Sequence, residues 1–122
     1  MAVPSAWEKA QAAIRRLDGE TETIALVARR GPSYLRVGGG RDGRYVVHAT
    51  FDNRTFHHLV DPAAGEGTIA LRVGGDDWEY PVRRCVGLKA ALQAAKHFAE
   101  TRALDPSLTW EEVQRFGPSP AG

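Results

Sequence analysis

Six short segments rich in β-branched and aromatic residues follow one another between residues 21 and 84, each separated from the next by turn-forming residues. The predicted strands are Thr21–Ala28, Ser33–Val37, Arg44–Thr50, Thr55–Val60, Gly67–Val73 and Trp78–Arg84. Consecutive strands joined by such short turns form an antiparallel meander and not a βαβ fold, which needs a helical crossover. Pro81 lacks a backbone N–H, so it restricts the last strand to a sheet edge or a bulge.

A helical pattern lies on each side of this run of strands. Ser5 and Glu8 have capping-box spacing, and the apolar residues that follow recur every three or four positions, which predicts a helix over Ser5–Leu17. The same periodicity predicts a longer helix over Leu88–Arg102. We therefore predict an α+β fold, in which one antiparallel meander sheet packs against an N-terminal and a long C-terminal helix.

The chain has 122 residues, which supports one domain with a core of its own. We expect this single α+β domain to span residues 1–116 and the run GPSPAG at 117–122 to be a flexible tail. Thr109 and Glu112 repeat the capping-box spacing, which predicts a short terminal helix.

The charges are balanced, with 16 basic against 15 acidic side chains and a net charge of +1. Acidic residues are interspersed throughout, which argues against a nucleic-acid partner, because such proteins usually carry a basic excess or stripe. No stretch approaches the roughly 18 apolar residues of a membrane span, and no export signal is visible. With a single cysteine, Cys85, the chain can form no internal disulfide, so we expect a cytoplasmic protein.

No group of residues predicts catalysis or metal binding. The run Gly38–Gly43 lacks the Gly-Lys-Ser/Thr ending of a phosphate loop and leads into a strand, so a hairpin turn is favoured. His57 and His58 are neighbours on a strand and point to opposite faces, which prevents joint binding of one metal ion. Cys85 is favoured as a small buried side chain over a nucleophile. We expect a protein that is no enzyme and has no cofactor.

One turn combines carboxylates with large aromatic side chains: Asp76, Asp77, Trp78, Glu79 and Tyr80. Aromatic anchors supply contact area, and clustered carboxylates can mimic phosphates toward a basic groove of a partner. The alternative is a hairpin whose aromatic residues share one core-facing side while its acids are solvated. Trp110 and Glu111 form a second acidic and aromatic pair.

The last third of the chain resembles the Imm1 family of immunity proteins from bacterial polymorphic toxin systems. The resemblance rests on Pro81–Gly87, on the helix Leu88–Phe98 that follows, and on Leu108-Thr109-Trp110. The hairpin at 33–47 is similar to the family's earlier half, so the resemblance covers roughly residues 33 to 112. Where the family usually has a glycine-containing turn after the helix, this chain has Thr101–Pro106.

The resemblance implies a cytoplasmic protein that binds and neutralises a cognate secreted toxin as a heterodimer. Toxins paired with this family are often nucleic-acid cytidine deaminases, which hold a zinc-activated water beneath a basic substrate channel. An inhibitor need only occlude that channel, so no small-molecule substrate is expected. The candidate toxin-binding residues are Asp76, Asp77, Trp78, Glu79, Tyr80, Trp110 and Glu111.

A second hypothesis is a small ligand-binding or enzymatic α+β domain. It would use the groove between the sheet and the helix at 88–102, with a pocket lined by His57 or His58 together with Arg72 and Tyr45. No motif in the sequence fixes a substrate for it.

Overall fold

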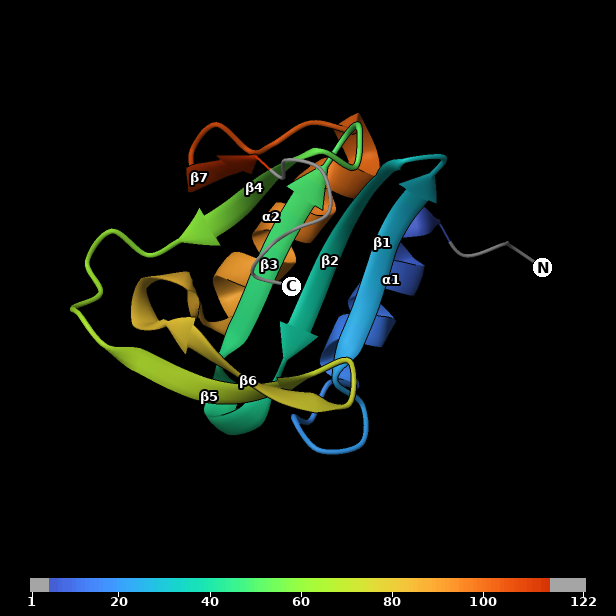
Figure 1. Cartoon of the computed structure of the whole chain (residues 1–122). Coiled ribbons are helices and arrows are strands. Elements are labelled where there is room, and N and C mark those ends of the chain that lie inside the picture. The colour runs from blue at the N-terminus through green and yellow to red at the C-terminus, as the bar shows by residue number, and fades with distance from the viewer. Residues whose placement is uncertain (1–4, 115–122) are drawn as a thin grey trace.

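The computed structural model describes residues 5–114, in which two helices cover one face of a five-stranded sheet and a two-stranded hairpin crosses the other face (Figure 1). The elements in chain order are α1 (Ala6–Arg15), β1 (Ile24–Arg30), β2 (Ser33–Gly39), η1 (Arg41–Gly43), β3 (Tyr45–Thr50), β4 (Thr55–Val60), β5 (Thr68–Val73), β6 (Asp76–Pro81), η2 (Val82–Arg84), α2 (Leu88–Thr101) and β7 (Thr109–Gln114). The α+β class and the antiparallel pairing are as predicted. The expected tail at 117–122 lies outside the described residues.

The main sheet has the order β1-β2-β3-β4-β7, so the predicted meander is confirmed for its first four strands. The last strand is a correction, because the short helix predicted at Thr109 is instead β7. It pairs with β4 in antiparallel register, from Val60 opposite Thr109 to Thr55 opposite Gln114. Six backbone pairings along an otherwise open sheet edge outweigh the local preference of a capping-box spacing for a helical turn.

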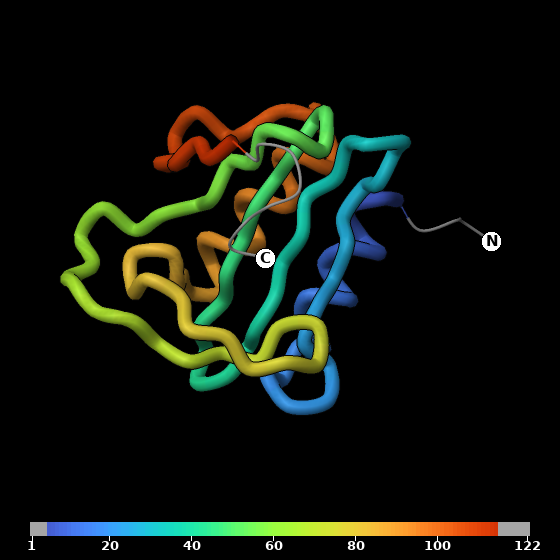
Figure 2. The backbone as a smooth tube through the Cα atoms, viewed as in Figure 1, coloured from blue at the N-terminus to red at the C-terminus, as the bar shows by residue number. Residues whose placement is uncertain are grey.

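The prediction of one sheet is also wrong, because β5 and β6 form a separate two-stranded sheet. A simple meander would place β5 beside β4, but β7 occupies that edge. The hairpin therefore folds back across the main sheet, and the tube in Figure 2 shows it running in front of the lower ends of β2 and β3. Pro81 ends β6, a strand that pairs only with β5, as expected for an edge strand.

Helices form within both predicted segments, but the second is not the last element of the fold, because β7 follows α2. The Ser5 hydroxyl accepts a hydrogen bond from the Glu8 N–H at 3.1 Å, and the Glu8 carboxylate accepts one from the Ser5 N–H at 3.1 Å, so the capping box is formed. In the described part of the chain, neither helix is long and apolar enough to cross a membrane.

The main core lies between the helices and the sheet. Alternate residues of the strands point into it, among them Leu35, Val37 and Val47, and Phe98 of α2 is fully buried against them. A second, smaller core lies on the opposite face, under the hairpin. Its buried members are Leu71, Val73 and Cys85.

Arg102 closes α2 in the left-handed conformation, with φ 58°, at the position where the resemblance led us to expect a glycine turn. Its guanidinium donates hydrogen bonds to the Ala28 carbonyl at 2.8 Å and to the Ser33 hydroxyl at 3.0 Å. It also lies 5.5 Å from the centre of the Phe98 ring. These contacts fasten the end of α2 to the turn between β1 and β2 and compensate for the backbone strain.

Gly38 sets how closely the hairpin approaches the main sheet. A Cβ at this position would lie 2.5 Å from Cγ1 of Val73, a residue of β5 whose buried side chain faces the main sheet. We expect Gly38→Ala to push the hairpin away and lower the free energy of unfolding by about 1–3 kcal/mol, as overpacking commonly does. Urea unfolding measures the loss, with Gly65→Ala as a control for glycine removal where no atom lies near and the backbone is not left-handed. Equal losses in both variants would contradict the close contact.

Candidate functional site

The sheet face away from the helices is only partly covered by the hairpin. We call the uncovered part the open face, and its residues are Ile24, Leu26, Tyr34, Arg36, His48, Phe56, His58 and Val113. Two hollows lie on it. The first, of about 310 Å³, is lined by Tyr34, Arg36, His48, Phe56, His58, Val113 and Gln114. The second, of about 330 Å³, lies toward β1, and Tyr34 and Arg36 line both.

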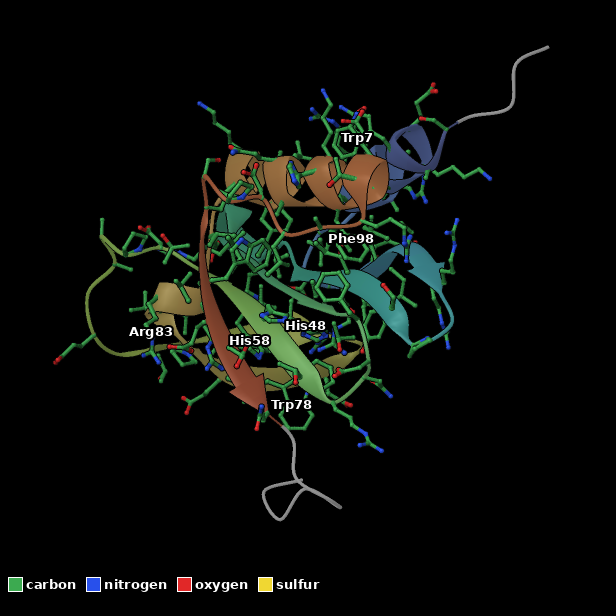
Figure 3. All side chains as sticks on the ribbon, turned by 90° about the horizontal axis from the view of Figure 1, so that it is seen from above. Trp7, His48, His58, Trp78, Arg83 and Phe98 are labelled. Carbon is green, nitrogen blue, oxygen red and sulfur yellow. The ribbon has the colours of Figure 1, made fainter. Side chains whose placement is uncertain are left out.

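The hairpin forms one rim of the open face. Tyr80 is half-buried and packs against the small core under the hairpin. Trp78 pairs with the buried Leu71 and so points to the same inner side, yet 57% of it is exposed. In Figure 3 Trp78 lies on the same side of the sheet as His48 and His58, and Phe98 lies on the helix side. Tyr80 is therefore part of the small core, whereas Trp78 is exposed enough to contact a partner.

Exposed apolar side chains gather around this face. The described part of the chain exposes five large apolar residues, and Ile24, Leu26 and Val113 are on the open face while Trp78 is at its rim. Only Phe51 lies elsewhere, against Phe98 and His57. Apolar surface gathered in one hollowed region is typical of a protein interface.

The three carboxylates of β6 are all exposed, but their surroundings differ. Asp77 accepts a hydrogen bond from Nε of Arg72 at 3.0 Å, and this contact lowers the pKa of the Asp77 carboxyl. Arg41 lies 3.7 Å from the same oxygen. Within residues 5–114, the carboxylates of Asp76 and Glu79 make no ion pair. Asp76 and Glu79 therefore carry the available negative charge of the hairpin.

Trp110 and Glu111 do not form one patch, because neighbours on β7 point to opposite faces. The Trp110 indole packs on the helix side, against the main core, and its N–H donates to the Asp105 carbonyl at 3.0 Å. Glu111 points to the other side, where its carboxylate accepts hydrogen bonds from Arg83 and Arg84. Both guanidinium groups lower the pKa of Glu111, Arg84 more strongly. Both residues thus hold β7 in place.

His58 is half-buried beside the Arg84–Glu111 pair. Burial is the main reason why its pKa falls from 6.5 to about 4, and the positive charges of Arg84 and Arg36 lower it further, against the opposing effect of Glu111. The imidazole is therefore neutral at pH 7. His57 points to the helix side, with its ring 5.9 Å from that of Phe51, so the prediction of opposite faces is confirmed.

The lowered pKa of His58 predicts a loss of stability in mild acid. The unfolded chain binds a proton as the pH falls through 6.5, whereas the folded chain resists it until about 4, so stability present above 6.5 is lost between these values. We expect the free energy of unfolding to fall by about 1–2 kcal/mol more in the parent chain than in His58→Gln between about pH 7.5 and pH 5. Urea unfolding at both pH values measures this. The same pH dependence in both chains would contradict the assignment.

The ligand pocket of the second hypothesis is not assembled. Tyr45 is buried in the main core on the helix side, Arg72 pairs with Asp77 on the hairpin, and His58 lies on the open face. Nor do residues 5–114 contain a group of three or more His, Cys, Asp or Glu side chains placed to hold a metal ion.

The sequence reasoning did not identify Arg36, His48 or Val113 as site residues. The alternation in β2, where Leu35 and Val37 are buried and Arg36 is not, was the signal that could have placed Arg36 on the face away from the core. Their gathering depends on the register of four strands, which one sequence does not specify.

Comparison with known proteins places the chain in a family. No curated protein matches it. The family model described as "Immunity protein Imm1" matches residues 2–112. The matched range contains both α-helices and all strands except the end of β7, so it includes the whole of β6 with its exposed acids and Trp78. The chain belongs to the Imm1 family and is an immunity protein whose partner is a toxin.

Proposed function

We propose that this immunity protein neutralises a secreted nucleic-acid cytidine deaminase by covering its active-site or substrate channel with β6 and the open face. The observation that supports this best is an exposed Trp78 at the rim of a hollowed apolar surface, on a strand with two carboxylates that form no ion pair within residues 5–114. Asp76 lies on the same side of β6 as Trp78, and Glu79 lies on the other side. Such a surface offers a charged contact and an aromatic anchor together.

The chemistry of the toxin favours an acidic contact. A deaminase that acts on nucleic acid needs a basic channel to hold phosphates above its zinc-bound water. Asp76 and Glu79 can occupy phosphate positions in that channel, since neither forms an ion pair within residues 5–114 and Arg72 acts on Asp76 only at longer range. The net charge of only +1 means that these two carboxylates of β6, and not the field of the whole protein, supply the attraction.

Trp78 is the proposed anchor of the interface. It is the most exposed large apolar side chain in the described structure, and burying an indole against a partner contributes strongly to affinity. The other predicted site residues position the surface. Tyr80 packs the hairpin onto the sheet, and Asp77 accepts a hydrogen bond from Arg72. Trp110 and Glu111 hold β7 through their contacts with Asp105 and Arg84.

In this account the protein acts by binding alone, as a heterodimer with the toxin in the cytoplasm of the producing cell. The test is a deamination assay with the toxin domain encoded beside its gene, using a labelled single-stranded oligonucleotide with one cytosine. We expect conversion to uracil to stop when the immunity protein reaches a one-to-one ratio. Full activity at a tenfold excess of immunity protein would contradict inhibition, and a toxin that cleaves the oligonucleotide without deaminating it would contradict the substrate class.

A further inference from the structure

We propose that Arg36 is a second anchor of the interface and binds a carboxylate side chain of the toxin in the first hollow of the open face. This inference rests on the proposed function, because it names a further contact with the same partner. Arg36 would supply a positively charged contact on the open face, in addition to the negatively charged contacts that the acids of β6 make at its rim.

The position of Arg36 is central. In the register of the sheet it lies between Leu26 of β1 and His48 of β3, and it lines both hollows. It is half-buried. Among the described residues that line the first hollow, it has the one permanently charged side chain.

Arg36 has no charge partner within residues 5–114, unlike the arginines around it. Arg72 and Arg41 contact Asp77 and Glu20, and Arg83 and Arg84 contact Glu111. The guanidinium of Arg36 makes no hydrogen bond or ion pair with any described residue. The carboxylate nearest in the sheet register, Glu111, is already held by two guanidinium groups, so Arg36 is left to a group from outside the chain.

The surroundings suit a carboxylate from a protein. Aromatic rings border the hollow, with the Tyr34 and His48 ring centres 6.0 Å apart and those of His48 and Phe56 5.5 Å apart. A partner that covers them would exclude water, and in that setting a guanidinium binds a carboxylate through two parallel hydrogen bonds. At about 310 Å³ the hollow is at the small end of the roughly 300–1,000 Å³ range of ligand sites, as suits one side chain of a partner.

Opposite charges at two places would also fix how the toxin docks. A toxin that presents basic residues to Asp76 and Glu79 must present an acidic residue to Arg36 in the same orientation. A partner with the basic residues alone would leave Arg36 covered and unpaired, which carries a large desolvation cost. The first hollow therefore contributes to selecting the cognate toxin.

Calorimetric titration of the cognate toxin with charge variants of the full chain tests this inference. We expect Arg36→Glu to weaken binding by about 30-fold or more, because truncating or reversing one side of a buried charge pair commonly does so. Arg36→Gln, which retains much of the side chain, should weaken it by about tenfold. The control is Lys9→Glu, the same charge change on exposed α1 at the opposite face, with an expected effect of less than about twofold. Thermal unfolding of each variant checks the fold.

The outcomes separate the inference from the function on which it rests. If the parent chain binds the toxin and both Arg36 variants bind as Lys9→Glu does, the inference is wrong and the proposed function stands. If the parent chain does not bind, both fall. A labelled single-stranded oligonucleotide is titrated in parallel: binding that is lost in Arg36→Glu would show that the hollow takes phosphate, and would also overturn the inference.

Discussion

Reversing both free carboxylates of β6, as Asp76→Lys with Glu79→Lys, should weaken binding of the cognate toxin by at least about 100-fold, since close charge pairs across an interface couple by about 1.5–7 kcal/mol each. The two lysines would lie against the basic channel that the proposed function requires. Repulsion then replaces attraction at the rim of the open face. Calorimetric titration at low salt measures the loss.

The control is Glu100→Lys, a single exposed charge reversal on α2 at the opposite side of the main sheet. It should leave the affinity within about twofold. The loss in the β6 variant should shrink at higher ionic strength, because exposed charges are screened. An affinity of the double variant within a few-fold of the parent chain would contradict the placement of the interface on β6.

Removing the ring of Phe98 should have the largest effect on stability. This side chain is fully buried between α2 and the sheet, with the Phe51 ring centre 5.8 Å and the Arg102 guanidinium 5.5 Å from its own ring. Phe98→Ala would leave a cavity where the end of α2 is fastened to the β1–β2 turn. We expect the free energy of unfolding to fall by about 3–5 kcal/mol, the usual cost of truncating a buried phenylalanine.

Urea unfolding with circular dichroism measures this loss. Phe98→Leu, which keeps most of the apolar volume, should lose less than half as much, so it gives a value even if the alanine variant is largely unfolded. Phe51→Ala is the control for removal of an aromatic ring, because 40% of Phe51 is exposed and its loss should cost less than that of Phe98. A change below about 1 kcal/mol in Phe98→Ala would contradict the central place of this residue in the core.

The parts of the fold that the sequence predicts are those fixed by neighbouring residues. The capping box of Ser5 and Glu8 marks the start of α1, and the periodicity of 88–101 marks α2. The connection at Gly38–Gly43 joins two paired strands as expected. The position of the hairpin, and the fact that 109–114 forms a strand, depend instead on which segment pairs with the free edge of β4. That competition is decided by tertiary packing, which local patterns do not contain.

The candidate site divides in the same way. The acids and Trp78 on β6 are adjacent in sequence, so composition alone draws attention to them. Arg36, His58 and Val113 come from three different strands and meet only through the register of the sheet. Sequence also cannot tell which carboxylates are already paired: Asp77 is engaged by Arg72, while Asp76 beside it forms no ion pair in the described structure.

We expect this immunity protein to bind and inactivate a toxin domain encoded beside its gene. The most direct test is a calorimetric titration of the purified chain against that toxin domain, with the toxin's activity assayed in the same samples. We predict one-to-one binding with a nanomolar dissociation constant and loss of activity at equimolar protein. An absence of binding at micromolar concentrations, with the toxin still active, would contradict the account.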